Sequence, residues 1–166
     1  LHTEAAEHRP IYSPDGQTLA YLRSEIPPRW DGMRDIWLYS LNSGTTAALP
    51  PTADRFGRHS RFLGWSPDGT HLYYCELHGT SSRIMQVSTT GNHTMLLAPE
   101  RGLYSDVALN RTWTHLGFVA ETPDEPEEAH IARIDSPNPE QISGVNHRYH
   151  SFPMGETQVL KWSSTN

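Results

Sequence analysis

The chain has 166 residues, enough for one domain with a sizeable core or for a piece of a larger domain. Its 13 Lys and Arg residues against 19 Asp and Glu residues give a formal net charge of −6, and the basic residues are scattered. Binders of nucleic acid or of anionic membranes carry a basic patch, so the composition argues against both partners. With 36% hydrophobic and 10% aromatic residues, the chain is too apolar for intrinsic disorder.

The single cysteine and the search for targeting signals give little information about the compartment of the protein. The single cysteine, Cys75, can form neither an intrachain disulfide nor a cysteine-based zinc site, so it leaves the compartment open, with the cytoplasm slightly favoured. The sequence has no apolar run near the ~20 residues that a membrane helix needs and no signal segment at its N-terminus. The chain begins and stops in mid-pattern, from which we expect a fragment.

A repeated pattern organises the chain from its first residues. Residues 12–22 (YSPDGQTLAYL) match residues 65–75 (WSPDGTHLYYC) position for position, as an aromatic residue, a turn and an alternating strand. A degraded third copy follows at 109–119 (LNRTWTHLGFV). A second motif comes after each copy, at residues 35–44 (DIWLYSLNSG), 82–91 (SRIMQVSTTG) and 129–138 (AHIARIDSPN). The sequence therefore contains three similar units.

Each unit divides into four expected strands. In the first unit, Pro-Asp-Gly at 14–16 and Asn-Ser-Gly at 42–44 are tight-turn signals. They separate predicted strands at 9–13, 18–23, 35–41 and 45–49. Four antiparallel strands in a repeat of about 40 to 50 residues are typical of a β-propeller blade, and propellers use about four to eight blades. The predicted fold is therefore all-β, with about three blades of four antiparallel strands that form an incomplete propeller.

The predicted boundaries place three blades at about 1–58, 59–104 and 105–153, with a further segment at 154–166. Because successive strands are antiparallel, the connections alternate between two faces of the disc. The turns inside the two motifs share one face. The longer connections share the other, which we expect to carry the function because variable loops bind ligands and partners. These connections are 24–34, 76–81, 121–128 and 50–59.

Aromatic residues at strand positions are expected to pack where blades meet. Tyr12, Trp37, Tyr39 and Trp65 are therefore predicted to belong to the blade core. Trp162 is expected to pack in the segment that follows the last blade.

These motifs resemble the propeller repeat of TolB-type periplasmic proteins and of prolyl-oligopeptidase-type serine peptidases. Residues 140–146 (EQISGVN) and 155–164 (GETQVLKWSS) are similar to the end of the last blade and the crossover segment in the acylaminoacyl-peptidase or dipeptidyl-peptidase branch. Gln158 stands where that branch usually has Glu. The resemblance implies a parent serine peptidase in which a propeller covers an α/β-hydrolase domain. It also implies that residues 154–166 lead into that domain and that the catalytic residues lie beyond Asn166.

The chain itself offers no catalytic serine. A nucleophile elbow requires Gly-x-Ser-x-Gly, and the nearest match, residues 64–69 (GWSPDG), misses by one position. Pro67 and the matching turn at Ser13 indicate that Ser66 is a turn residue.

The sequence has ten histidines, of which only His147 and His150 are close together. A zinc site would need a third ligand, so neither a metal site nor a cofactor is predicted. The acidic run 121–128 lacks the regular ligand spacing of a calcium loop and is interpreted as a solvated loop.

The candidate binding residues are Arg29, Trp30 and Arg34. They lie in the predicted loop 24–34 on the face that we expect to be functional. Arginine forks and an aromatic anchor can hold a peptide carboxylate or a partner domain. The alternative is a solvent-exposed hairpin without a ligand.

Two functional hypotheses follow. The first is a non-catalytic propeller portion of a serine peptidase that hydrolyses short peptides, which gates substrate access and docks the hydrolase domain. The second is a non-enzymatic TolB-like propeller that mediates protein–protein interaction. The motif around Trp162 favours the first hypothesis. A metal-dependent lactonase or a glycan-binding propeller would need convergent carboxylates, and the sequence offers no such set.

Overall fold

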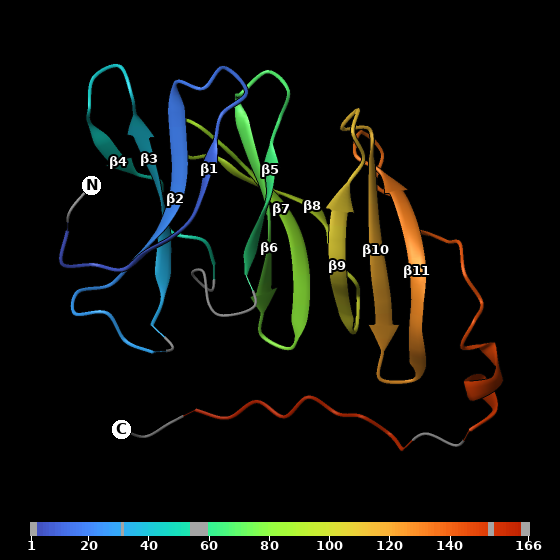
Figure 1. Cartoon of the computed structure of the whole chain (residues 1–166). Helices are drawn as coiled ribbons and strands as arrows, with labels where there is room; N and C mark the ends of the chain where they lie inside the picture. Colours follow the sequence, from blue (N-terminus) through green and yellow to red (C-terminus); the bar gives the residue numbers. More distant parts are fainter. Residues whose placement is uncertain (1–2, 31, 54–59, 153–154, 164–166) are drawn as a thin grey trace.

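The structure is a computed structural model that describes residues 3–30, 32–53, 60–152 and 155–163. These residues form three four-stranded antiparallel sheets, each built from strands that are consecutive in the chain (Figure 1). Each sheet is one propeller blade, as predicted. Blade 1 contains β1 (Glu7–Tyr12), β2 (Thr18–Ser24), β3 (Arg34–Ser40) and β4 (Thr46–Ala48).

The second and third blades repeat this order. Blade 2 contains β5 (Arg61–Trp65), β6 (His71–His78), β7 (Ser81–Ser88) and β8 (His93–Leu97). Blade 3 contains β9 (Leu103–Leu109), β10 (His115–Thr122), β11 (Glu125–Arg133) and β12 (Glu140–Gln141). The first strands β1, β5 and β9 contact one another in turn, so the blades stand side by side with these strands adjacent. Blade 3 starts two residues before the predicted boundary at 105.

Two hydrophobic cores join the blades. Alternate residues of a strand point to opposite faces, so each blade offers one apolar face to each neighbour. The core between blades 1 and 2 contains Ala20, Leu22, Ile36, Leu49, Trp65, Leu72, Tyr74, Met85 and Val87. The core between blades 2 and 3 contains Cys75, Ile84, Leu97, Val107, Leu116, Phe118 and Ala132. The indole N–H of Trp65 also donates to the Ile11 carbonyl at 3.2 Å, which ties blade 2 to blade 1.

The prediction for the aromatic residues is right for Trp65, which is 3% exposed, and wrong for Tyr12, which is 61% exposed. Tyr12, Trp37 and Tyr39 lie on the sheet face of blade 1 that points away from blade 2, since Tyr12 pairs with Leu19 and Leu19 pairs with Tyr39. In the described part of the chain, no further blade packs on that face. Trp37 is half-buried there, under the Arg23 guanidinium at 4.5 Å.

The turns of the first motif keep one shape in spite of different residues. The hydroxyls of Ser13 and Ser66 each accept a backbone N–H five residues ahead at 2.9 Å. In blade 3, the Asn110 side-chain oxygen takes over this role and accepts from the His115 N–H at 3.0 Å. Trp113 occupies the left-handed position with φ 57° that a glycine takes in the other two turns.

Two of the connections that were predicted to be long are tight hairpins. β6 ends at His78 and β7 begins at Ser81, and only residues 123–124 separate β10 from β11. The prediction of a solvated loop at 121–128 is therefore wrong, because most of this acidic run belongs to strands. Strand formation buries the carboxylate of Glu128, and this burial is tolerated because three groups donate hydrogen bonds to the carboxylate, as described below.

The predicted division of the connections between two faces is confirmed. Four connections lie at the same end of the blades, which we call the lower face (Figure 1). They are residues 25–30 and 32–33 after β2, hairpins 79–80 and 123–124, and the beginning of the connection after β4. Residues 54–59 of that connection lie outside the described residues.

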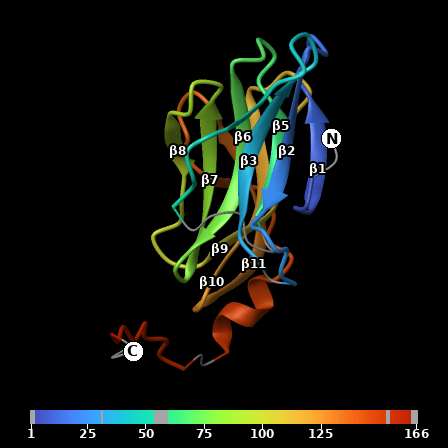
Figure 2. The same ribbon diagram turned by 90° about the vertical axis from the view of Figure 1, so that its left-hand side faces the viewer.

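After β12 the chain passes through a short 3₁₀ helix, η1 (His147–Ser151). Residues 155–163 then run extended beneath the lower face, and we call them the C-terminal strap (Figures 1 and 2). No helix among the described residues has the length and the apolar character needed to cross a membrane.

Candidate functional site

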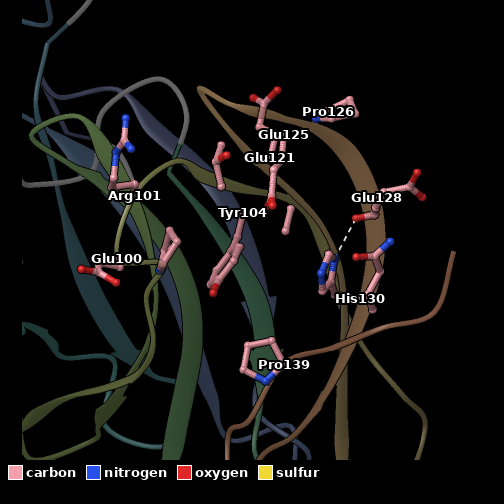
Figure 3. Close-up of a pocket in the computed structure, with 13 residues that line it drawn as sticks. Glu100, Arg101, Tyr104, Glu121, Glu125, Pro126, Glu128, His130 and Pro139 are labelled. Atoms are coloured by element: carbon pink, nitrogen blue, oxygen red, sulfur yellow. Dashed lines mark hydrogen bonds between the residues drawn. The ribbon is translucent and has the colours of Figure 1, made fainter. Parts of the chain in front are cut away.

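Two adjoining hollows lie on the lower face where blades 2 and 3 meet. One of about 330 Å³ opens beside Tyr104 and His130, and its lining is drawn in Figure 3. A second, of about 690 Å³, lies between the blades and the C-terminal strap. We call the first the edge pocket and the second the strap groove. They are continuous, because Glu100, Arg101, Glu121 and Thr122 line both.

Aromatic side chains form the inner wall of the edge pocket. The rings of Tyr104 and Phe118 lie 4.5 Å apart between centroids, and the His130 ring stacks on Phe118 at 5.8 Å and 13°. His130 Nδ1 lies 2.9 Å from the Glu128 carbonyl oxygen, which can only accept a hydrogen bond. This contact assigns a hydrogen to Nδ1, so the Nδ1–H group of His130 donates to the Glu128 carbonyl oxygen.

The carboxylate of Glu128 anchors the chain that follows the last blade. Glu128 is 4% exposed and accepts hydrogen bonds from the Asn146 N–H at 2.6 Å, the Val145 N–H at 3.3 Å and the Ser143 hydroxyl. Ser143 in turn accepts the Ala129 N–H at 2.8 Å. A buried carboxylate is stable when several donors satisfy its lone pairs. Glu128 therefore fixes the position from which η1 and the strap depart.

The rim of both hollows is acidic. The single arginine of the rim, Arg101, pairs with Asp124 at 3.0 Å, so its charge is balanced. Within the residues that the structure describes, Glu100, Glu121 and Glu125 form no ion pair. Three carboxylates without a local counterion leave this part of the lower face negative.

The strap groove is mainly apolar between these carboxylates. Its blade side includes Gly102, Leu103 and Pro123, and its strap side includes Val159, Leu160 and Trp162. Trp162 is 85% exposed and Leu160 is 76% exposed, so the expectation that Trp162 packs within its segment is wrong. In the described part of the chain, too few groups surround the indole to bury it.

The predicted binding residues lie elsewhere on the lower face, at blade 1. Arg29 forms an exposed ion pair with Glu25 at 3.5 Å, and Trp30 is 93% exposed. Arg34 is the first residue of β3 and pairs with Ser24, and its Nε is buried without a hydrogen-bond partner among the described residues. No hydrogen bond or ion pair within the described chain joins any two of Arg29, Trp30 and Arg34. Their role stays a prediction.

The structure agrees with the prediction that Ser66 is a turn residue. Its hydroxyl donates to Asp68 at 2.5 Å and accepts the His71 N–H at 2.9 Å, and the side chain is buried. The hydrogen bond from Ser66 is the main cause that lowers the pKa of Asp68 to about 2.

Burial raises the pKa of the Cys75 thiol to about 11, which disfavours the reactive thiolate. In the part of the chain that the structure describes, no group of three or more His, Cys, Asp or Glu side chains could hold a metal ion.

Sequence reasoning missed the edge pocket and the anchoring role of Glu128. A signal for Glu128 exists in the alternation of β11, because Glu128, His130 and Ala132 share one face and Ala132 belongs to the core. The sequence does not identify the hydrogen-bond partners of Glu128. Two of them are backbone N–H groups, which every residue except proline has.

No family model matches the chain. The chain is 30% identical over 90 residues to the uncharacterized peptidase YuxL of Bacillus subtilis (strain 168), a match that covers 53% of this chain and 13% of YuxL. The chain thus spans only a small part of that relative.

Solved structures with the same fold come from several functional classes. A prolyl endopeptidase matches with a TM-score of 0.64, 14% identity, and coverage of 86% of this chain and 22% of that protein. An oligogalacturonate lyase from Vibrio parahaemolyticus matches with a TM-score of 0.63, 16% identity, and coverage of 85% and 41%. A protein assigned as TolB from Agrobacterium tumefaciens matches with a TM-score of 0.56, 18% identity, and coverage of 84% and 49%.

At these identities the likeness shows the fold alone, which is that of β-propeller blades. The propellers that share it include peptidases such as acylaminoacyl peptidase as well as TolB, so the resemblance found in the sequence extends to three dimensions. Each matched protein is longer than this chain, which spans less than half of each.

Proposed function

We propose that this chain is the non-catalytic propeller portion of a serine peptidase that hydrolyses short peptides. In this role it docks an α/β-hydrolase domain of the same parent protein and gates the access of substrates. The observation that carries the proposal is the C-terminal strap. It leaves blade 3 at the position where the resemblance places a crossover segment, and it runs along the lower face with Leu160 and Trp162 exposed.

Exposed large apolar side chains on an extended segment support docking. Val159, Leu160 and Trp162 offer a row of apolar surface that water solvates poorly, and a folded domain against the lower face would bury it. The weak similarity to the peptidase YuxL supports the same parent class.

Gating fits the arrangement of the blades. A propeller placed over an active site restricts entry by size, so short unfolded peptides pass and folded proteins do not. Arg29, Trp30 and Arg34 sit at the same face under blade 1, and we propose them as contacts to the docked domain or to a peptide carboxylate. The chain supplies no nucleophile in this proposal, since Ser66 is held in a turn.

Hydrolysis and covalent labelling test this function. Short acyl-peptide and dipeptide chromogenic substrates and a serine-directed phosphonate probe are applied to the 166-residue chain and to the longest product of its gene. We expect activity and labelling in the longer product alone. Labelling of the 166-residue chain would contradict its non-catalytic role. A longest product that neither hydrolyses nor reacts with the probe would overturn the peptidase function and favour a TolB-like propeller that binds a protein partner.

A further inference from the structure

The strap groove has the size and lining of a ligand site. Its volume of about 690 Å³ lies within the range of about 300 to 1,000 Å³ that is usual for pockets that bind small ligands. Leu103 and Pro123 provide an apolar wall on the blade side, and Leu160 and Trp162 provide one on the strap side. An apolar side chain placed between these walls would be enclosed from two sides.

The negative charge at the rim of the strap groove favours a cationic ligand. Glu100 and Glu121 line the groove without an ion pair among the described residues, while Arg101 is neutralised by Asp124. Lys161 belongs to the strap but does not line the groove. Two unbalanced carboxylates beside an apolar floor complement a ligand that combines a cationic group with apolar side chains.

The backbone of the strap favours an extended ligand. Residues 155–163 belong to no sheet, and within the described chain their backbone makes no hydrogen bond. Free N–H and C=O groups in an extended segment can pair with another extended chain, which is how peptides add to an exposed strand edge.

We propose that the strap groove binds an extended peptide that carries a cationic group, an ammonium or a guanidinium, beside Glu100 and Glu121. An apolar side chain of the same peptide packs between Leu103 and Trp162. The proposal rests on the proposed function for the class of ligand, and it names the chemistry of that peptide and the residues that select it. The cationic group can come from a basic side chain or from a free N-terminus, because both present N–H donors to carboxylates.

Direct binding to the 166-residue chain tests the proposal without hydrolysis. The probe is a dye-labelled hexapeptide of alternating leucine and lysine with an acetylated N-terminus, and binding is followed by fluorescence anisotropy. The matched probe alternates leucine and glutamate. A third probe alternates leucine and serine with a free N-terminus, which separates the two sources of the cation. We expect the lysine peptide to bind at least about tenfold more tightly than the glutamate peptide.

Matched variants assign the binding to the groove. Glu100→Gln with Glu121→Gln should weaken binding of the lysine peptide by about three- to tenfold, because a carboxylate that stays in contact with solvent contributes modestly. The control pair, Glu4→Gln with Glu7→Gln, removes the same charge from blade 1, where neither residue lines the groove, and should change nothing.

The aromatic contact has its own matched pair. Trp162→Ala should weaken the lysine peptide by about tenfold, because a tryptophan that is buried by the ligand is a typical hot spot. Tyr12→Ala removes an exposed aromatic ring from blade 1 that does not line the groove, and it should have no effect. Circular dichroism and melting temperature verify the fold of every variant.

Three results would overturn the proposal: equal affinity for the lysine and glutamate peptides, equal losses in the two glutamate pairs, or no binding of any probe. The failure of the peptidase function is distinguishable from these. If the lysine peptide binds but the longer product does not hydrolyse peptides, the peptide site in the strap groove is supported and the peptidase function is refuted. If the longer product hydrolyses peptides but no probe binds in the strap groove, the peptidase function is supported and the peptide site is refuted.

Discussion

Replacement of Glu128 should loosen the C-terminal part of the chain and lower its stability. The Glu128 carboxylate is 4% exposed and accepts hydrogen bonds from Ser143, Val145 and Asn146. The bond from Val145 is long at 3.3 Å and contributes little, so the loss in Glu128→Ala comes mainly from the bonds that Ser143 and Asn146 donate to the charged carboxylate. Such bonds contribute about 1.5 to 3 kcal/mol each when buried. Because Asn146 is half-buried, we expect a total loss of about 3 kcal/mol.

Glu128→Gln should cost about half as much, about 1.5 kcal/mol, because the amide keeps one oxygen acceptor but turns an N–H₂ group toward the other donors. Urea unfolding measures both losses. At a slope of about 1 to 3 kcal/mol per molar urea, the alanine variant should unfold at a midpoint about 1 to 3 M lower. Glu127→Gln is the matched control. It changes an exposed neighbour and should stay within about 0.5 kcal/mol.

Limited proteolysis with trypsin gives the local readout. Arg148 lies in η1, directly after the segment that Glu128 holds, so its cleavage should accelerate in Glu128→Gln. Lys161 lies in the exposed strap and should be cut at the same rate in both proteins. Unchanged urea midpoints together with an unchanged rate at Arg148 would refute the anchoring role of Glu128.

Three further experiments test the packing of the interior and the geometry of the turns. Gly64→Ala should cost about 1 to 3 kcal/mol in thermal unfolding, because φ is +146° and the new Cβ would lie 2.5 Å from the Trp113 ring; an unchanged melting temperature would contradict this packing. The folded-state pKa of Asp68, about 2, is below its ordinary value of 3.8, so its carboxylate stabilises the fold fully above pH 4 to 5 and loses this effect as pH falls toward 2. The difference in melting temperature between the natural chain and Asp68→Asn should therefore shrink over that window, and a constant difference would disprove the linkage. The Cys75 thiol should resist a thiol reagent at pH 8 in the folded chain and react after unfolding in urea; rapid reaction without urea would show that the thiol is accessible.

The sequence alone determined the fold class, because the signals for blades are local. The Ser-Pro-Asp-Gly turns at 13–16 and 66–69 fix where strands reverse, and period-2 alternation fixes which residues face a neighbouring blade. The predicted strands at 9–13 and 18–23 lie within two residues of β1 and β2. The turn role of Ser66 followed from the same local chemistry and is confirmed.

Only the tertiary structure decided how the lower face is built. The acidic run at 121–128 has the composition of a loop, yet it forms strand because Glu128 finds its donors 15 to 18 residues further along the chain. The strap groove joins residues near 80, 100, 121 and 160, which no sequence spacing connects. Tyr12 has the pattern of a core residue and is exposed, because burial depends on whether another blade covers its face. Local patterns specify turns and alternation, whereas burial and the assembly of a groove depend on which distant surfaces meet.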